Sequence, residues 1–378
     1  MPAFAQIDPF QRQLLQVGYN QSFEGSPPFA GYAFFYWNRP EFYRENLTLR
    51  VAVAPVYMDS ELGIAHALGP NTDLGIGVAG GGFAESYRDF QDGKHVPEES
   101  FIGSGGGSYL SLYHRFNPNQ RIPLFAMLRG GLFYSTYNDS GDTGRGFQLP
   151  NDHGSANFRA GLRYGGKQPV LYPSLALELA VWAESLNRAN AGSYGYDREL
   201  ELNSSVGLFY GNAYFAYTFE RGDNLSVSVT AGDSVNADPL SAYRLGGILP
   251  LVAEYPLIIP GYFYQEISAQ RFVLFNGRYA VALDPAKRWQ LTAMAATAAV
   301  GYLKGFEEPG RWNSGVGGGV SYQSESGVWK AAVSYGYGFD AIRNGSRGAN
   351  VIGLFLQFDL ERSLNQKRGG VPWPWQFR

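Results

Sequence analysis

The feature that most constrains this chain is a period-two alternation of side chains in short segments that recur along most of the sequence. In residues 47–54 (LTLRVAVA) aliphatic side chains occupy every second position, as expected for a strand with one face toward an apolar medium. Residues 174–182 (SLALELAVW) repeat the pattern. Connections between such segments alternate between short turns and longer loops, which is typical of a transmembrane barrel. We therefore predict an all-β fold, a transmembrane antiparallel β-barrel of about 16 strands, with about 14 as the alternative.

Hydropathy and composition favour this barrel over membrane helices and over soluble β folds. Mean hydropathy is -0.22, and no charge-free apolar run reaches the ~18 residues of a membrane helix. A hydropathy average does not detect the strands of a barrel, because only every second residue of each strand faces lipid. Tyrosine, phenylalanine and glycine number 26, 26 and 49, which favours strands. Charged residues are 17% of the chain, too few to cover a soluble sandwich, and the blade repeat of a propeller is missing.

Charge, cysteine and histidine content exclude several classes of function. The formal net charge is -3, without a basic run, so we expect no nucleic-acid partner. The chain has 0 cysteines, which excludes disulfides and thiol catalysis. Ser111 and His114 are three positions apart and point to opposite faces of a strand, and the aspartates of residues 138–152 lack the regular spacing of a calcium loop. We expect no enzymatic activity, no metal and no cofactor.

The two ends of the chain are expected to lie outside the barrel. Ala3–Ala5 (AFA) resembles the small-x-small cleavage site of a secretory signal, with a chance triplet as the alternative. We interpret residues 1–5 as a signal-peptide remnant and residues 6–29, which are polar and rich in turn residues, as an N-terminal periplasmic segment. Residues 30–361 are predicted to form the barrel as one domain, and residues 362–378 a tryptophan-containing C-terminal tail.

Residues 233–265 interrupt the strand pattern with a stretch too long for a turn. Loops of this length inside a regular fold are usually functional or disordered. The apolar content of this stretch, which includes Ile248, Leu249 and Ile259, argues against disorder. We therefore predict a long loop that folds inward and narrows the lumen.

The loop and the C-terminal strands carry a family resemblance. Residues 243–247 (YRLGG), residues 260–262 (PGY), the strand 271–283 and the segments 317–322 and 329–338 resemble elements of the BamA/TamA-type (bacterial surface antigen) superfamily of outer-membrane barrels. The resemblance implies a barrel-only member, without periplasmic repeat domains, whose long external loop folds back into the lumen. The lumen-loop motif that it implies comprises Arg244, Leu245, Gly246, Gly247, Pro260, Gly261, Tyr262 and Glu266.

The loop departs from the family at its tip. Pro260 stands where the family carries an arginine. The stretch 295–301 (AATAAVG), where the acidic partner of that arginine would lie, contains no acid. The absence of both groups is coherent, because one buried charge without the other is costly. We therefore expect the buried ion pair that the family forms at the loop tip to be absent from this chain.

Charged residues of the central strands are candidates for the lumen lining. Arg159 and Arg163 share one face of a predicted strand, opposite Phe158 and Leu162. They should point into the lumen, because on the lipid face each would cost ~2–4 kcal/mol near the midplane. They either attract anions or pair with acids and fill the interior, and we favour pairing. The candidate lining residues are Arg159, Arg163, Glu178, Glu199 and Glu201.

These features predict a protein of the outer membrane of a diderm bacterium, in contact with outer-membrane lipid and with other envelope proteins as candidate partners. The family resemblance implies a non-enzymatic scaffold, assembly or translocation factor, or conduit. The alternative is a solute-conducting, porin-like channel with a constricting loop.

Overall fold

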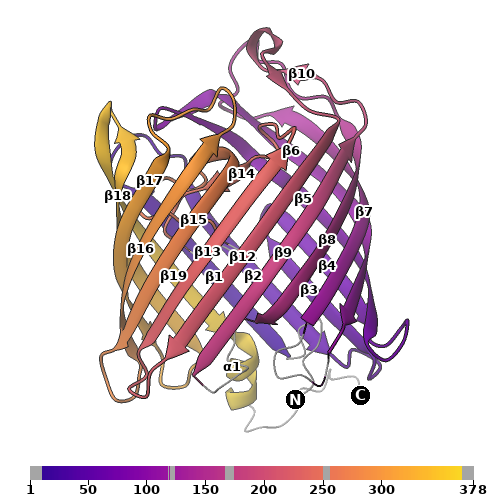
Figure 1. The fold of residues 1–378 in the computed structure, drawn as a ribbon, viewed down its shortest axis with the longest axis vertical. Coiled ribbons are helices and arrows are strands. Elements are labelled where there is room, and N and C mark those ends of the chain that lie inside the picture. Colours follow the sequence, from indigo (N-terminus) through magenta and orange to yellow (C-terminus); the bar gives the residue numbers. More distant parts are fainter. Residues whose placement is uncertain (1–10, 118, 120–123, 167–173, 250–255, 368–378) are drawn as a thin grey trace.

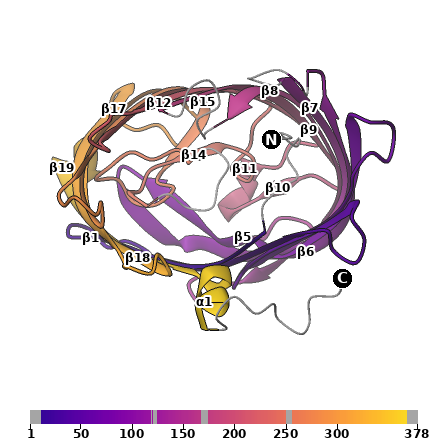
Figure 2. The same ribbon diagram turned by 90° about the horizontal axis from the view of Figure 1, so that it is seen from below.

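The computed structural model describes residues 11–117, 119, 124–166, 174–249 and 256–367. Within these residues, 16 antiparallel strands close into a barrel (Figures 1 and 2). The first strand pairs with the second and with the last, which closes the sheet. The strands are β1 (Arg12–Ser22), β2 (Ala30–Pro40), β3 (Leu47–Ala54), β4 (Tyr57–Ile64), β5 (Thr72–Gln91), β6 (Lys94–Arg115), β7 (Leu124–Asp139), β8 (His153–Gly166), β9 (Leu175–Arg188), β12 (Ser205–Thr218), β13 (Asn224–Val235), β15 (Ile267–Ala282), β16 (Trp289–Tyr302), β17 (Trp312–Gln323), β18 (Trp329–Arg343) and β19 (Ser346–Asp359).

Shorter elements accompany the wall. A small hairpin of β10 (Ser193–Tyr194) and β11 (Leu200–Glu201), with the 3-10 turn η1 (Tyr196–Arg198), lies in the connection between β9 and β12. Strand β14 (Tyr243–Leu245) pairs with the first residues of β15. Helix α1 (Leu360–Lys367) follows β19 at the rim that carries the short turns (Figure 1). No helix among the described residues is long and apolar enough to cross a membrane.

The alternation predicted from sequence determines which face of each strand meets lipid. On β13, Val227 and Val229 are 45% and 39% exposed on the outside. Ser226 and Thr230, one position away, are buried on the lumen side. Since side chains of a strand alternate between faces, the all-β antiparallel barrel is confirmed, with the larger of the two strand numbers.

The prediction of a periplasmic segment over residues 6–29 is wrong for residues 12–22, which form barrel strand β1. This strand appears polar because Gln16 and Asn20 point into the lumen together with Gly18, while Val17 is exposed on the lipid side. The barrel thus begins at Arg12 rather than at residue 30. It ends at Asp359, close to the predicted boundary. The signal-peptide remnant at residues 1–5 and residues 368–378 of the tail lie outside the described residues.

Candidate functional site: the lumen loop

The long connection between β13 and β15 covers residues 236–266, and we refer to it as the lumen loop. Its described residues turn into the barrel and pack on the inner wall, as predicted. Ile259 and Tyr262 are completely buried and share one apolar cluster with Phe272, Leu274 and residues of the β16 wall. The loop is therefore part of the packed interior.

Glycines of the lumen loop and of the wall allow the two backbones to approach each other closely. Gly261, in the predicted tip motif, has a φ of 89°, and a Cβ there would overlap the backbone of Gly338 on β18. A Cβ on Gly315 of β17 would overlap the carbonyl group of Pro260. Glycine at these positions is thus required by the close approach of two backbones. The Tyr262 hydroxyl donates a hydrogen bond to Asn313 at 3.2 Å.

A buried ion pair anchors the C-terminal end of the lumen loop. The Arg343 guanidinium at the end of β18 donates to both carboxylate oxygens of Glu266, at 2.6 and 2.8 Å. Their side chains are 2% and 0% exposed. The same carboxylate accepts the Phe263 N–H at 2.7 Å, and the Phe263 ring lies 3.6 Å from the guanidinium. This pair is distinct from the family's loop-tip pair, because the acid is at the loop base and the arginine is at the end of β18.

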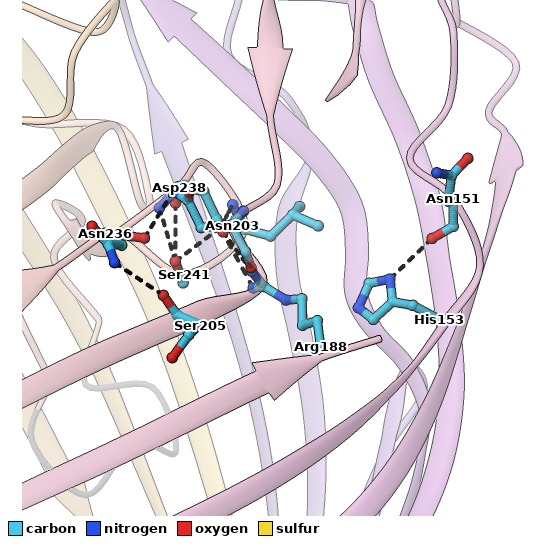
Figure 3. A network of polar contacts seen from close by, with 9 residues as sticks. Asn151, His153, Arg188, Asn203, Ser205, Asn236, Asp238 and Ser241 are labelled. Carbon is cyan, nitrogen blue, oxygen red and sulfur yellow. Dashed lines mark hydrogen bonds and ion pairs between the residues drawn. The ribbon is translucent and has the colours of Figure 1, made fainter. Parts of the chain in front are cut away.

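A second buried pair anchors the N-terminal end (Figure 3). Arg188 at the end of β9 donates to the Asp238 carboxylate, and the two side chains are 4% and 0% exposed. Asp238 also accepts hydrogen bonds from the Asn203 N–H at 3.0 Å, the Leu240 N–H at 3.1 Å and the Ser241 hydroxyl at 2.8 Å. This residue was not predicted from the sequence, although an aspartate with a serine three positions later at the start of an apolar loop is a common turn signal.

The remaining motif residues shape the loop around these anchors. Arg244 donates to the carbonyl group of Pro239 at 3.1 Å, so it stabilises the first turn of the loop. Leu245 is completely buried. Gly246 and Gly247 have φ values of 128° and 97°, a region that favours glycine. The structure thus places the predicted motif in one region, where these residues shape the loop backbone.

Only part of the predicted lumen lining lies on the barrel wall. Arg163 and Glu178 face each other in the lumen at 3.7 Å, and the Arg159 guanidinium lies 4.3 Å from the centre of the Trp182 ring. Glu199, by contrast, is exposed in the loop between β9 and β12. Glu201 is also exposed there, so the prediction that these two line the lumen is wrong. Leu200, which lies between them, packs against a separate apolar cluster of loop residues, and this alternation imitates that of a wall strand.

A network that sequence analysis missed occupies the lumen beside β3–β7, and we call it the lumen polar cluster. Arg50 pairs with Asp59 at 2.6 Å, and Arg129 pairs with Glu61 at 3.1 Å. Tyr109 donates to Asp59 at 2.9 Å, and Tyr113 donates to Glu61 at 2.7 Å. Two cations face two anions, which favours interior filling over attraction of anions. The cluster consists of Arg50, Asp59, Glu61, Tyr109, Tyr113 and Arg129.

An acid in the connection between β16 and β17 lies near the C-terminal anchor. Glu308 is 9% exposed. Burial and the nearby Glu266 carboxylate raise the pKa of Glu308 to about 8, although Arg343 acts in the opposite direction. This carboxyl group is therefore mostly protonated at neutral pH. Arg343 accordingly forms its ion pair with Glu266 and not with Glu308.

Comparisons with known proteins identify the fold. No family model and no curated protein sequence matches the chain. The structure of CdiB from Acinetobacter baumannii is similar, with a TM-score of 0.58 at 11% identity, and the match covers 95% of this chain and 64% of that chain. BamA from Haemophilus ducreyi lacking POTRA domains 1-3 gives a TM-score of 0.55 at 10% identity, with 92% and 70% covered.

The chain thus spans less than two thirds of the CdiB chain. At such identities the likeness concerns the fold alone, since one fold hosts many functions. The chain has the closed barrel of bacterial outer-membrane proteins.

The Glu266–Arg343 anchor can be tested by mutation. Replacing Glu266 with Gln leaves a buried guanidinium without its anion, so the free energy of unfolding should fall by about 3–5 kcal/mol. The matched control is Glu325→Gln, which breaks an exposed turn pair with Arg288 at 2.6 Å and should cost at most about 1 kcal/mol. Urea unfolding in detergent, followed by heat-modifiable gel migration, measures both. Equal effects of the two substitutions would contradict a buried anchor.

The raised pKa of Glu308 predicts that the stability of the protein depends on pH. Burial raises the pKa of Glu308 from the ordinary carboxyl value of 4.5 to about 8 in the folded state. Between these values the folded protein therefore holds a proton that the unfolded chain has lost. Stability contributed by this site should fall as pH rises through this window and level off above it. Urea midpoints measured from acid to alkaline pH should show a shallower decline in Glu308→Gln than in the wild type. An unchanged slope in the variant would assign the decline to other groups.

Proposed function

We propose that this protein is a barrel of the outer membrane of a diderm bacterium whose lumen is closed at rest by the lumen loop. In this proposal it acts without chemistry of its own, as a scaffold, assembly factor or translocation factor of the BamA/TamA type, with other envelope proteins as its clients. The observation that carries the proposal is the anchoring of the loop at both ends, by Asp238 to Arg188 and by Glu266 to Arg343.

The two anchors attach the loop to separate parts of the wall. Arg188 ends β9 and Arg343 ends β18, and in the sheet these strands are separated by β12, β13, β15, β16 and β17. The loop is therefore held across the interior at the rim with the longer connections. A connection with only a surface role would not require two buried charge pairs, each of which is costly to break. This arrangement supports a loop that is retained in the lumen for function.

A steadily open, porin-like channel has less support. The lumen polar cluster balances its own charges, and Arg163 faces Glu178. These side chains form ion pairs with one another. They therefore do not form a lumen lining of a single charge sign that would select ions. The apolar body of the lumen loop occupies the opposite side of the lumen, against β15–β19.

Conductance across planar lipid bilayers tests the proposal. The wild-type protein should be closed most of the time, because the anchored loop narrows the lumen. Arg343→Ala releases the loop end and should raise the open fraction about tenfold or more, since ~1.4 kcal/mol suffices for a tenfold change. Arg288→Ala, at an exposed turn, is the control and should behave like the wild type. A large, steady current through the wild-type protein would refute the closed-lumen proposal and favour the porin-like alternative.

A further inference from the structure

The barrel wall is lowest at the hairpin of β3 and β4. These strands have 8 residues each, whereas β5 and β6 have 20 and 22. The β2–β3 ladder begins at Phe35, so residues 30–34 of β2 rise above β3 while pairing with β1. On the other side, the β4–β5 ladder ends at Gly81, but β5 continues to Gln91. The wall therefore has a notch above the turn at residues 55–56.

The notch opens at the level of lipid. Eight residues at a rise of about 3.3 Å give a strand of about 26 Å, and a tilt of ~40° reduces its height to about 20 Å, below the ~25 Å apolar band of such barrels. The hairpin tip agrees with this position. Pro55 is exposed, and Val56 and Met58 are 42% and 44% exposed. A turn that ended in water would carry polar turn residues.

The hairpin of β5 and β6 extends from the edge of the notch across the interior. Its tip approaches the end of β18, where a Cβ on Gly93 would overlap the carbonyl group of Ile342. Phe90 packs on Phe263 of the lumen loop, with ring centroids 5.6 Å apart. Figure 2 shows the violet β5–β6 segment extending across the interior toward the yellow strands. The notch is a window in the side of the barrel, flanked by β2 and β5.

Behind this window lies a cavity of about 1130 Å³. Its lining includes Tyr32 and Phe34, which face the lumen, and also Val17 and Ala33 on the lipid side of β1 and β2. The lining also includes Pro55 and Val56 of the β3–β4 turn, so the cavity extends from the lumen to the notch and through it toward the lipid-facing surface. It is larger than the ~300–1,000 Å³ of typical small-molecule pockets.

The two ends of the cavity differ in polarity. Ile248 and Leu249 of the lumen loop supply an aliphatic wall beside the aromatic side chains of β2. Arg50, Asp59 and Tyr57 form a polar floor with hydrogen-bond donors and acceptors. An apolar space with a few polar groups at one end fits a molecule that has a long apolar chain and an ester or carboxyl group.

We propose that this cavity binds the acyl chain of a lipid from the surrounding membrane, which enters sideways through the window between β2 and β5. The continuity of the cavity with the lipid-facing surface identifies the membrane as the source of the chain. The proposal goes beyond a closed scaffold barrel, and it holds whether or not the protein assembles or translocates other proteins.

Photocrosslinking tests the proposal with the full chain in vesicles of dioleoylphosphatidylcholine. Benzoylphenylalanine replaces Phe34 in the cavity, Tyr214 at a lumen-facing position of β12, or Val78 on the lipid face of β5. After irradiation, mass spectrometry should find intact phospholipid attached at position 34 at about ten times the level found at position 214. The level at position 34 should be comparable to that at position 78. The reason is that position 34 lies in the lipid-accessible cavity, whereas position 214 faces the lumen away from it.

A blocking variant makes the test specific. Ala52 is 6% exposed and lines the cavity, so Ala52→Phe should reduce the adduct at position 34 about tenfold by filling space and leave position 78 unchanged. Heat-modifiable migration confirms that each variant is folded, and Ala54→Phe replaces Ala52→Phe if the latter fails. Equal labelling at positions 34 and 214, no adduct at 34, an adduct with the mass of a free fatty acid, or an adduct that a folded blocking variant does not reduce would each overturn the proposal.

Discussion

The ion pair between Glu266 and Arg343 is the interaction on which the arrangement of the lumen depends. Removal of two charges from water is costly, and their attraction compensates only when the geometry is good and further hydrogen bonds satisfy the remaining atoms. Here the guanidinium bonds both carboxylate oxygens, the Phe263 N–H supplies another donor, and the Phe263 ring covers the guanidinium. With this loop end fixed, Tyr262 and Ile259 lie against the glycine-rich inner wall.

Charges elsewhere in the barrel follow the same rule of pairing. The Asp238–Arg188 pair fixes the other loop end, and the lumen polar cluster balances its own charges beside β3–β7. The lipid-facing surface carries aliphatic and aromatic side chains in alternation with this polar interior. A barrel built in this way has a packed loop on one side of its lumen and a hydrogen-bonded network on the other. The space left between them, beside β1 and β2, is the cavity that opens toward lipid.

The sequence was sufficient to predict the barrel, its strand number and the inward loop, because lipid and lumen impose opposite requirements on neighbouring residues of one strand. It was insufficient for β1, whose lumen-facing Gln16 and Asn20 resemble a polar terminal segment when the opposite face is ignored. The Glu266–Arg343 pair could not be predicted, because the two residues are 77 positions apart and only the closed strand order brings them together. Glu199 and Glu201 were misplaced because a short loop hairpin imitates the period of a wall strand.

The most direct test of the closed lumen uses the absence of native cysteine. Val351 on β19 is completely buried beneath Ile248 and Leu249 of the lumen loop, whereas Ser228 on β13 is a lumen-facing, half-buried residue outside that cluster. The measurement is the rate at which a charged, membrane-impermeant maleimide labels Val351→Cys and Ser228→Cys in folded protein. A loop seated on the wall predicts labelling at position 351 about a hundredfold slower than at position 228, since local opening must come first. Equal rates at the two positions would contradict the account.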